Sequence, residues 1–149
     1  MDGVTSPLYN TDILRLAATI PYAQRLADPM GSSEKRSPIC GSRVTVDVDT
    51  DDEGRVAAIG MLVRACALGQ ASASLMAQGA LGKSPAELAA ARDGLTEWLS
   101  GGREAPPEWS GLHLFEPALS HSARHASIRL AFEAAAEAAE QAAAKALAR

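Results

Sequence analysis

The hydrophobic positions of the chain follow two different periods, which predict helices and strands in separate stretches. In residues 8–20 apolar side chains recur every three to four positions, and this pattern predicts an amphipathic helix that ends before Pro21. Residues 44–48 instead alternate valine with threonine and aspartate, and a second apolar run covers residues 56–63 beyond a polar turn. This alternation predicts a β-hairpin with one buried face.

Three more helices are predicted after the hairpin. Small residues dominate positions 65–80, which permits a helix there to pack closely on the sheet. Residues 84–99 begin with Ser-Pro-Ala-Glu, in which serine caps the helix and proline suits its first turn. Residues 101–123 contain three prolines and predict a loop or a broken helix, whereas alanine, glutamate and leucine predict a final helix from residue 123.

A turn-rich segment before the hairpin and an alanine-rich segment at the end of the chain complete the expected organisation. Turn-forming residues in 27–38 predict a loop with a short edge strand over residues 34–37. We therefore expect one α+β domain, residues 1–133, which suits a chain of 15.5 kDa. Residues 134–149 are so rich in alanine that we expect a weakly packed helical extension or a contact with a partner.

Charge and hydropathy narrow the classes of function. A net charge of -4 and no run of lysine or arginine longer than two residues argue against a nucleic-acid partner. No stretch approaches the ~20 apolar residues of a membrane span, and the N-terminus does not resemble a signal peptide. We therefore expect no membrane partner and a cytoplasmic protein, where thiols tend to bind metals or to be catalytic.

Two cysteines and a histidine are the candidate site residues. Cys40 lies in Ser-Pro-Ile-Cys-Gly-Ser (residues 37–42), and Cys66 lies where the second hairpin strand gives way to a helix, whose positive end favours a thiolate. His125, at the start of the last helix, would supply a third ligand of a tetrahedral site, and His121 could assist or replace it. The alternative is that both cysteines are small buried hydrophobes.

Other motifs give no further candidate. The acidic run 47–53 begins like a calcium loop, but counting from Asp47 its sixth and twelfth positions hold Asp52 and Ala58, so a solvated hairpin turn is predicted. His113 has no neighbouring ligand type and is expected at the surface. Hydrolase, nucleotide-binding and zinc-protease motifs do not occur in the sequence.

Over roughly residues 6–135 the chain resembles the NifU/IscU/SufU family of iron-sulfur cluster assembly scaffolds. The 26-residue step from Cys40 to Cys66 fits this family, and the 59 residues from Cys66 to His125 look more like its SufU branch. The resemblance implies an α+β fold in which helices cover a small antiparallel three-stranded sheet, as in SufE and NifU. The matching segments are residues 8–14, 37–42, 64–74, 82–84 and 124–132.

The resemblance also implies a function. Cys40, Cys66 and His125 would bind a transient [2Fe-2S] cluster for acceptor apo-proteins, with Ser42 or a second molecule completing the shell and Arg124 donating to a sulfide or persulfide. Sulfur would come from a cysteine desulfurase, and the chain would be a carrier rather than an enzyme, monomeric or weakly dimeric. One alternative is a zinc-bound, sulfurtransferase-like sulfur acceptor in which Cys40 or Cys66 carries a persulfide. Another is a degenerate relative that only binds partners.

The chain departs from the family pattern at two candidate residues and in one motif. Ser42 stands where the family has an aspartate, and serine is a weak ligand. His125 stands where the family has a third cysteine; imidazole keeps a ligand, removes negative charge and tends to raise the reduction potential of a cluster. Residues 115–119 replace the family's Leu-Pro-Pro-Val-Lys segment, so its dedicated chaperone is not expected as a partner.

Overall fold

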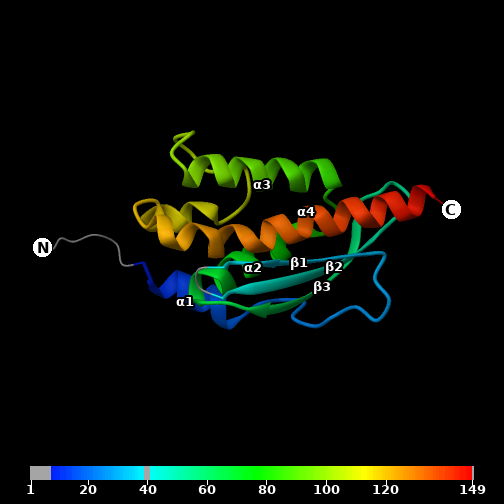
Figure 1. Cartoon of the computed structure of the whole chain (residues 1–149), viewed down its shortest axis with the longest axis horizontal. Helices are drawn as coiled ribbons and strands as arrows, with labels where there is room; N and C mark the ends of the chain where they lie inside the picture. The colour runs from blue at the N-terminus through cyan, green and yellow to red at the C-terminus, as the bar shows by residue number, and fades with distance from the viewer. Residues whose placement is uncertain (1–7, 39–40, 149) are drawn as a thin grey trace, which may run out of the picture.

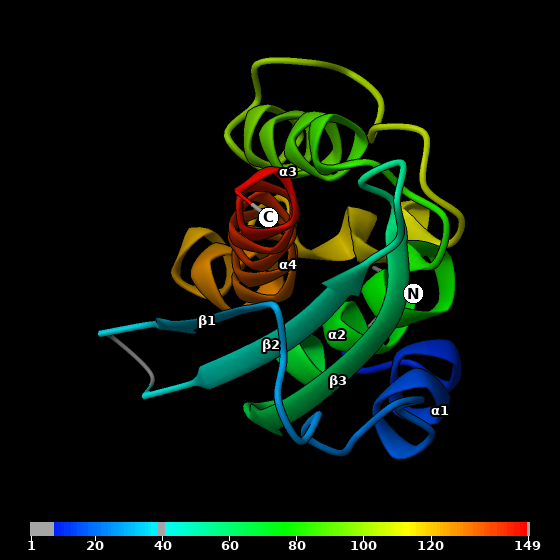
Figure 2. The same ribbon diagram turned by 90° about the vertical axis from the view of Figure 1, so that its right-hand side faces the viewer.

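A long C-terminal helix, α4 (His125–Leu147), forms the middle layer of the molecule in the computed structural model, which describes residues 8–38 and 41–148. The sheet packs against one side of α4 and helix α3 (Pro85–Leu99) against the other (Figures 1 and 2). Helix α2 (Ala67–Ala80) contacts both α4 and the last strand. This layered α+β arrangement confirms the predicted fold class.

The sheet has three antiparallel strands in the order β1 (Gly31–Arg36), β2 (Arg43–Thr50) and β3 (Val56–Arg64). The predicted hairpin is confirmed, and its alternating valines, Val44 and Val46 among them, are fully buried. The edge strand begins at residue 31 rather than 34. Its sequence, Gly-Ser-Ser-Glu-Lys-Arg, has no apolar alternation, so only pairing with β2 and polar contacts to α4 reveal its length.

Local capping explains where the other helices begin. Asn10 accepts a hydrogen bond from the Ile13 amide at 3.0 Å, and Ser84 and Glu87 form a reciprocal capping box at the start of α3. The predicted broken helix between α3 and α4 consists of two short 3-10 helices. The helices not yet located are α1 (Thr11–Ala18), η1 (Leu112–Ala118) and η2 (Ser122–Arg124).

The alanine-rich end of the chain is packed, which corrects the expected weakly packed extension. Six of its alanines have no exposed surface because α4 lies between the sheet and α3: Ala134, Ala135, Ala136, Ala138, Ala139 and Ala142. Small side chains bring the backbones together, and a Cβ added at Gly31 would overlap the carbonyl oxygen of Ala138. Helix α4 runs through residue 134 without interruption; a functional boundary at that point stays a prediction.

The acidic run is divided between the sheet and the turn, so the solvated-turn prediction is wrong for Asp47. This carboxylate is fully buried on β2 and accepts from Arg25 Nε at 2.6 Å, Ser32 Oγ at 2.7 Å and the Leu26 amide at 3.0 Å. Burial raises the pKa of Asp47, but these hydrogen bonds outweigh burial and hold its pKa below the usual range. Asp47 therefore holds residues 25–26 and strand β1 against strand β2.

Within the described ranges, no helix combines the length and the apolar character needed to cross a membrane.

Candidate functional site

Cys66 lies at the junction of a strand and a helix. It is the N-cap residue of α2, with extended backbone angles, and its side chain makes no capping hydrogen bond. The thiol is free and partly exposed, as expected for a ligand that an incoming ion must reach. Its backbone carbonyl accepts the Gln70 amide at 2.9 Å, so the first turn of α2 holds Cys66 at the positive end of that helix.

The loop that carries the other candidate thiol joins β1 to β2. Cys40 itself lies outside the described residues. The Ser37 amide donates to the Ser42 carbonyl at 2.8 Å, and the Gly41 amide donates to the Ser37 carbonyl at 3.0 Å. Gly41 has a φ of 73°, a left-handed conformation that glycine adopts without strain. The two strand ends are therefore tied together on either side of the candidate thiol.

His125 is the first residue of α4, and only 8% of its surface is exposed. Its Nε2 lies 2.8 Å from the carbonyl oxygen of Ala118, at the end of η1. A carbonyl oxygen only accepts, so Nε2 carries the proton, and a neutral imidazole then keeps the lone pair on Nδ1. Metal-ligating histidines commonly donate their second nitrogen to a backbone carbonyl in this way.

The N-terminal halves of α2 and α4 are packed against each other, which brings the segments that begin at Cys66 and His125 to the same region. Ser72 donates from Oγ to the Ile128 carbonyl at 2.6 Å. A Cβ added at Gly69 would lie 2.7 Å from the Ala65 Cβ and 3.3 Å from the Ser127 carbonyl oxygen, so glycine keeps this contact close without a shift of its neighbours. Residues 66 and 125 lie three and two positions before Gly69 and Ser127.

The remaining candidates differ in accessibility. Ser42 is buried, with 4% of its surface exposed, whereas Arg124 is exposed at the N-cap of α4. His121 and His113 are both exposed. Among the described residues no group of three or more His, Cys, Asp or Glu side chains could hold a metal ion, and the third member of the predicted set, Cys40, is outside them.

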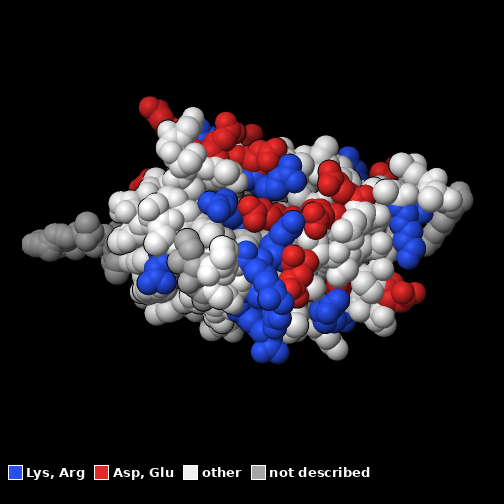
Figure 3. All heavy atoms as spheres, in the orientation of Figure 1, with Lys and Arg blue, Asp and Glu red and all other residues white. Residues whose placement is uncertain are grey.

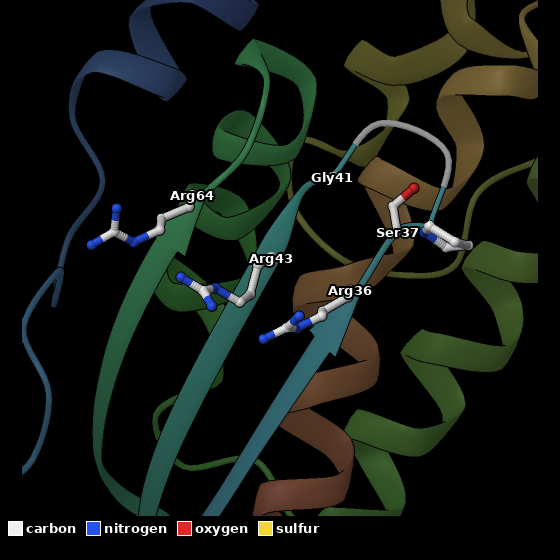
Figure 4. A pocket seen from close by; sticks show the side chains of 6 residues that line it. Arg36, Ser37, Gly41, Arg43 and Arg64 are labelled. Atoms are coloured by element: carbon white, nitrogen blue, oxygen red, sulfur yellow. The ribbon is translucent and has the colours of Figure 1, made fainter.

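Sequence reasoning missed a row of three arginines beside the cysteine loop. Arg36 pairs with Arg43, and Arg43 pairs with Arg64, so one residue from each strand lies on a single line across the sheet, which we call the arginine row. Their side chains extend to the same side of the sheet (Figure 4). With Ser37, Pro38 and Gly41 they line a pocket of about 440 Å³.

Basic side chains are also gathered on one face of the molecule. Lys and Arg side chains gather in a stripe over the sheet, with acidic side chains beside it (Figure 3). The alternating valines of β2 and the apolar run of β3 could have placed Arg43 opposite Arg64. The polar sequence of β1 gives no comparable register signal, so the position of Arg36 depends on tertiary contacts.

Comparison with known proteins identifies relatives among solved structures. The N-terminal part of a nitrogen-fixing NifU-like protein from Brucella abortus is 39% identical, with a TM-score of 0.85 over 91% of this chain and 94% of that one. A putative iron-sulfur cluster assembly scaffold for the SUF system from the thermophile Fervidobacterium islandicum AW-1 is 18% identical, with a TM-score of 0.78 over 89% and 96% of the two chains, and shows a shared fold.

A hypothetical protein solved at 2.3 Å is 25% identical, with a TM-score of 0.69, and the match covers 87% of this chain and 94% of that one. No family model and no curated protein sequence matches the chain.

Proposed function

Because the chain belongs to the NifU/IscU/SufU family of scaffold-type proteins, we propose that it is an iron-sulfur cluster assembly scaffold. Its cargo is a transient [2Fe-2S] cluster bound by Cys40, Cys66 and His125 and passed to acceptor apo-proteins. The chain acts as a carrier rather than an enzyme, and its sulfur comes from a cysteine desulfurase. The role requires reduced thiols, which a reducing compartment such as the cytoplasm maintains.

The hydrogen bond between His125 and Ala118 is the observation that carries this proposal. It fixes the tautomer of the imidazole and leaves Nδ1 as the nitrogen able to bind iron. Among the described residues, the Nε2 bond is the hydrogen bond found for the His125 side chain, so Nδ1 stays available to a metal ion. Cys66, at the head of the helix packed beside α4, supplies a partly exposed thiol in the same region.

The donor set suits iron and sulfide. Thiolates and imidazole both bind iron in [2Fe-2S] proteins, and mixed ligation raises the reduction potential above that of all-thiolate clusters. Ser42, or a donor from a second molecule, completes the shell. Arg124 is exposed next to His125 in the sequence and is proposed to donate hydrogen bonds to bound sulfide.

Anaerobic reconstitution tests the proposal. Wild type and the variants Cys66→Ala and His125→Ala are incubated with ferrous iron, cysteine, a cysteine desulfurase and dithiothreitol, which reduces the persulfide sulfur to sulfide. The products are then read by visible absorption and by iron and zinc analysis. His113→Ala is the matched control because His113 is exposed and is not among the proposed ligands. We expect a thiolate-to-iron charge-transfer spectrum in wild type and control, lost in Cys66→Ala and altered in His125→Ala.

Two results would overturn the scaffold role. Tightly bound zinc with no chromophore, released by Cys66→Ala, would identify the chain as a zinc-bound sulfur acceptor. Spectra and metal contents that are identical in all four proteins would remove both residues from the site.

A further inference from the structure

The arginine row places three like charges on adjacent strands at directly opposed positions. Neighbouring strands are about 5 Å apart, and like charges directly opposite each other destabilise a sheet. Glu34 pairs with Arg36 at 2.8 Å between carboxylate oxygen and Nε, which neutralises one end of the row. In the described part of the chain, Arg43 and Arg64 form no ion pair.

The side chains of the arginine row do not pack in the hydrophobic core. The valines of β2 point toward the helices, so Arg43, one position before Val44, extends from the opposite face of the sheet. Arg64 is exposed, and the Arg36 side chain keeps 66% of its exposure despite its ion pair. Glu34 attracts Arg43 as well as Arg36, but one carboxylate does not balance three guanidinium groups, so the row can take a further counter-charge from outside the molecule.

The surroundings of the row favour a protein as the source of that charge. The pocket that the arginine row lines is bounded, among the described residues, by three arginines with Ser37, Pro38 and Gly41, and it lacks the large apolar and aromatic walls that normally hold a small ligand. Leu62 lies on the same face of β3 as Arg64 and is 37% exposed, and Tyr22, whose carbonyl accepts the Met61 amide, is 46% exposed. Arginine beside exposed apolar and aromatic side chains is typical of protein interfaces.

We propose that the arginine row is a docking site for an acidic segment of a partner protein, whose carboxylates pair with Arg43 and Arg64. Arginine suits this role because its planar group binds a carboxylate through two hydrogen bonds. Arg36 and Arg43 flank the loop 37–42, and Arg64 lies two residues before Cys66, so a partner docked on the row lies beside both segments that carry a candidate thiol. In this respect the inference rests on the proposed function and names the chemistry of its partner.

Binding of a labelled acidic peptide to the full, metal-free chain tests the inference independently of any cluster. A fluorescein-labelled oligoglutamate peptide is titrated by fluorescence anisotropy against wild type and Arg43→Gln/Arg64→Gln. Arg15→Gln/Arg103→Gln is the control, because it removes the same charge from two exposed positions outside the row. Circular dichroism and thermal unfolding establish that all three proteins are folded.

We expect the row variant to weaken peptide binding about tenfold and the control variant less than about twofold. Arg43→Lys/Arg64→Lys, which keeps the charge and loses the bidentate geometry, is expected to bind with intermediate affinity. Binding in wild type should weaken as salt is added, with a smaller salt dependence in the row variant.

Three outcomes would overturn the inference. Equal losses in the row and control variants would mean that net charge alone governs binding. Pyrophosphate is the competing ligand: if it binds wild type more tightly than the peptide does, displaces the peptide from wild type and does not bind the row variant, the row is a small-anion site. If folded wild type does not bind the peptide at low salt, the docking site does not exist. Cluster reconstitution tests the proposed function separately, so that function can hold even if the docking site does not.

Discussion

The Nε2 atom of His125 and the carbonyl oxygen of Ala118 lie 2.8 Å apart, and this hydrogen bond joins the end of η1 to the start of α4. The 3-10 helix η1, which ends at Ala118, therefore orients the imidazole ring of the candidate ligand in addition to connecting α3 to α4. A cysteine at position 125 could bind metal but could not make this bond with comparable strength. The histidine and the carbonyl that orients it therefore form one unit.

Replacing His125 with cysteine should lower the reduction potential of a reconstituted cluster. Thiolate adds negative charge and stabilises the oxidised cluster, so we expect a decrease on the order of 100 mV. An anaerobic dye-mediated titration of wild type, His125→Cys and the control His113→Cys measures the potentials. A potential that is the same in all three proteins would show that residue 125 does not ligate the cluster.

Replacing Asp47 with asparagine should destabilise the protein by about 2–3 kcal/mol, because the buried carboxylate accepts from Arg25, Ser32 and the Leu26 amide. Urea unfolding near neutral pH measures the difference. Asp52→Asn, at an exposed position in the β2–β3 turn, is the control and should change stability by less than about 0.5 kcal/mol. Equal effects of the two substitutions would contradict the assigned role of Asp47.

The contribution of Asp47 should also depend on pH. Its pKa is lower in the folded than in the unfolded chain, so the unfolded state binds more protons near pH 4. The stability that Asp47 provides is therefore complete above about pH 4 and is lost as the pH falls through its folded-state pKa. Wild type and Asp47→Asn should converge in unfolding free energy as the pH is lowered, and a constant difference would argue against this linkage.

Enlarging a buried alanine of α4 should cost more than enlarging an exposed one. Ala138 is fully buried where α4 crosses the glycine of β1, so Ala138→Leu should lower the unfolding free energy by about 1–3 kcal/mol or prevent folding. Ala144→Leu makes the same change at an exposed position of the same helix and should be nearly neutral. Thermal unfolding compares them, and two equally stable variants would contradict the packing of α4 against β1.

The contact between α2 and α4 can be weakened without adding volume. Ser72→Ala removes the buried hydrogen bond to the Ile128 carbonyl and should cost about 1 kcal/mol. Ser110→Ala, at an exposed position, is the control. Urea titrations of both variants give the comparison; no difference between them would mean that this bond does not hold the two helices together.

Pattern and propensity predicted most of the elements because each depends on nearby residues. The alternation around Val46 located the hairpin, and Ser84 with Glu87 located the start of α3. The same reasoning failed for the alanine-rich helix α4. Small side chains pack weakly only where the neighbouring element lies too far away for them to reach it. Here Gly31 lets the sheet approach the backbone of Ala138 closely enough for small side chains to fill the space.

The order of elements, the family resemblance and the candidates Cys66 and His125 follow from the chain alone, because motifs, spacings and caps depend on residues that are close in the sequence. Three further relationships required the folded molecule: the contact of His125 with Ala118, the burial of Asp47, and the alignment of three arginines in one row. These relationships join residues distant in the sequence, and their positions follow from strand register and helix packing, which no single segment specifies.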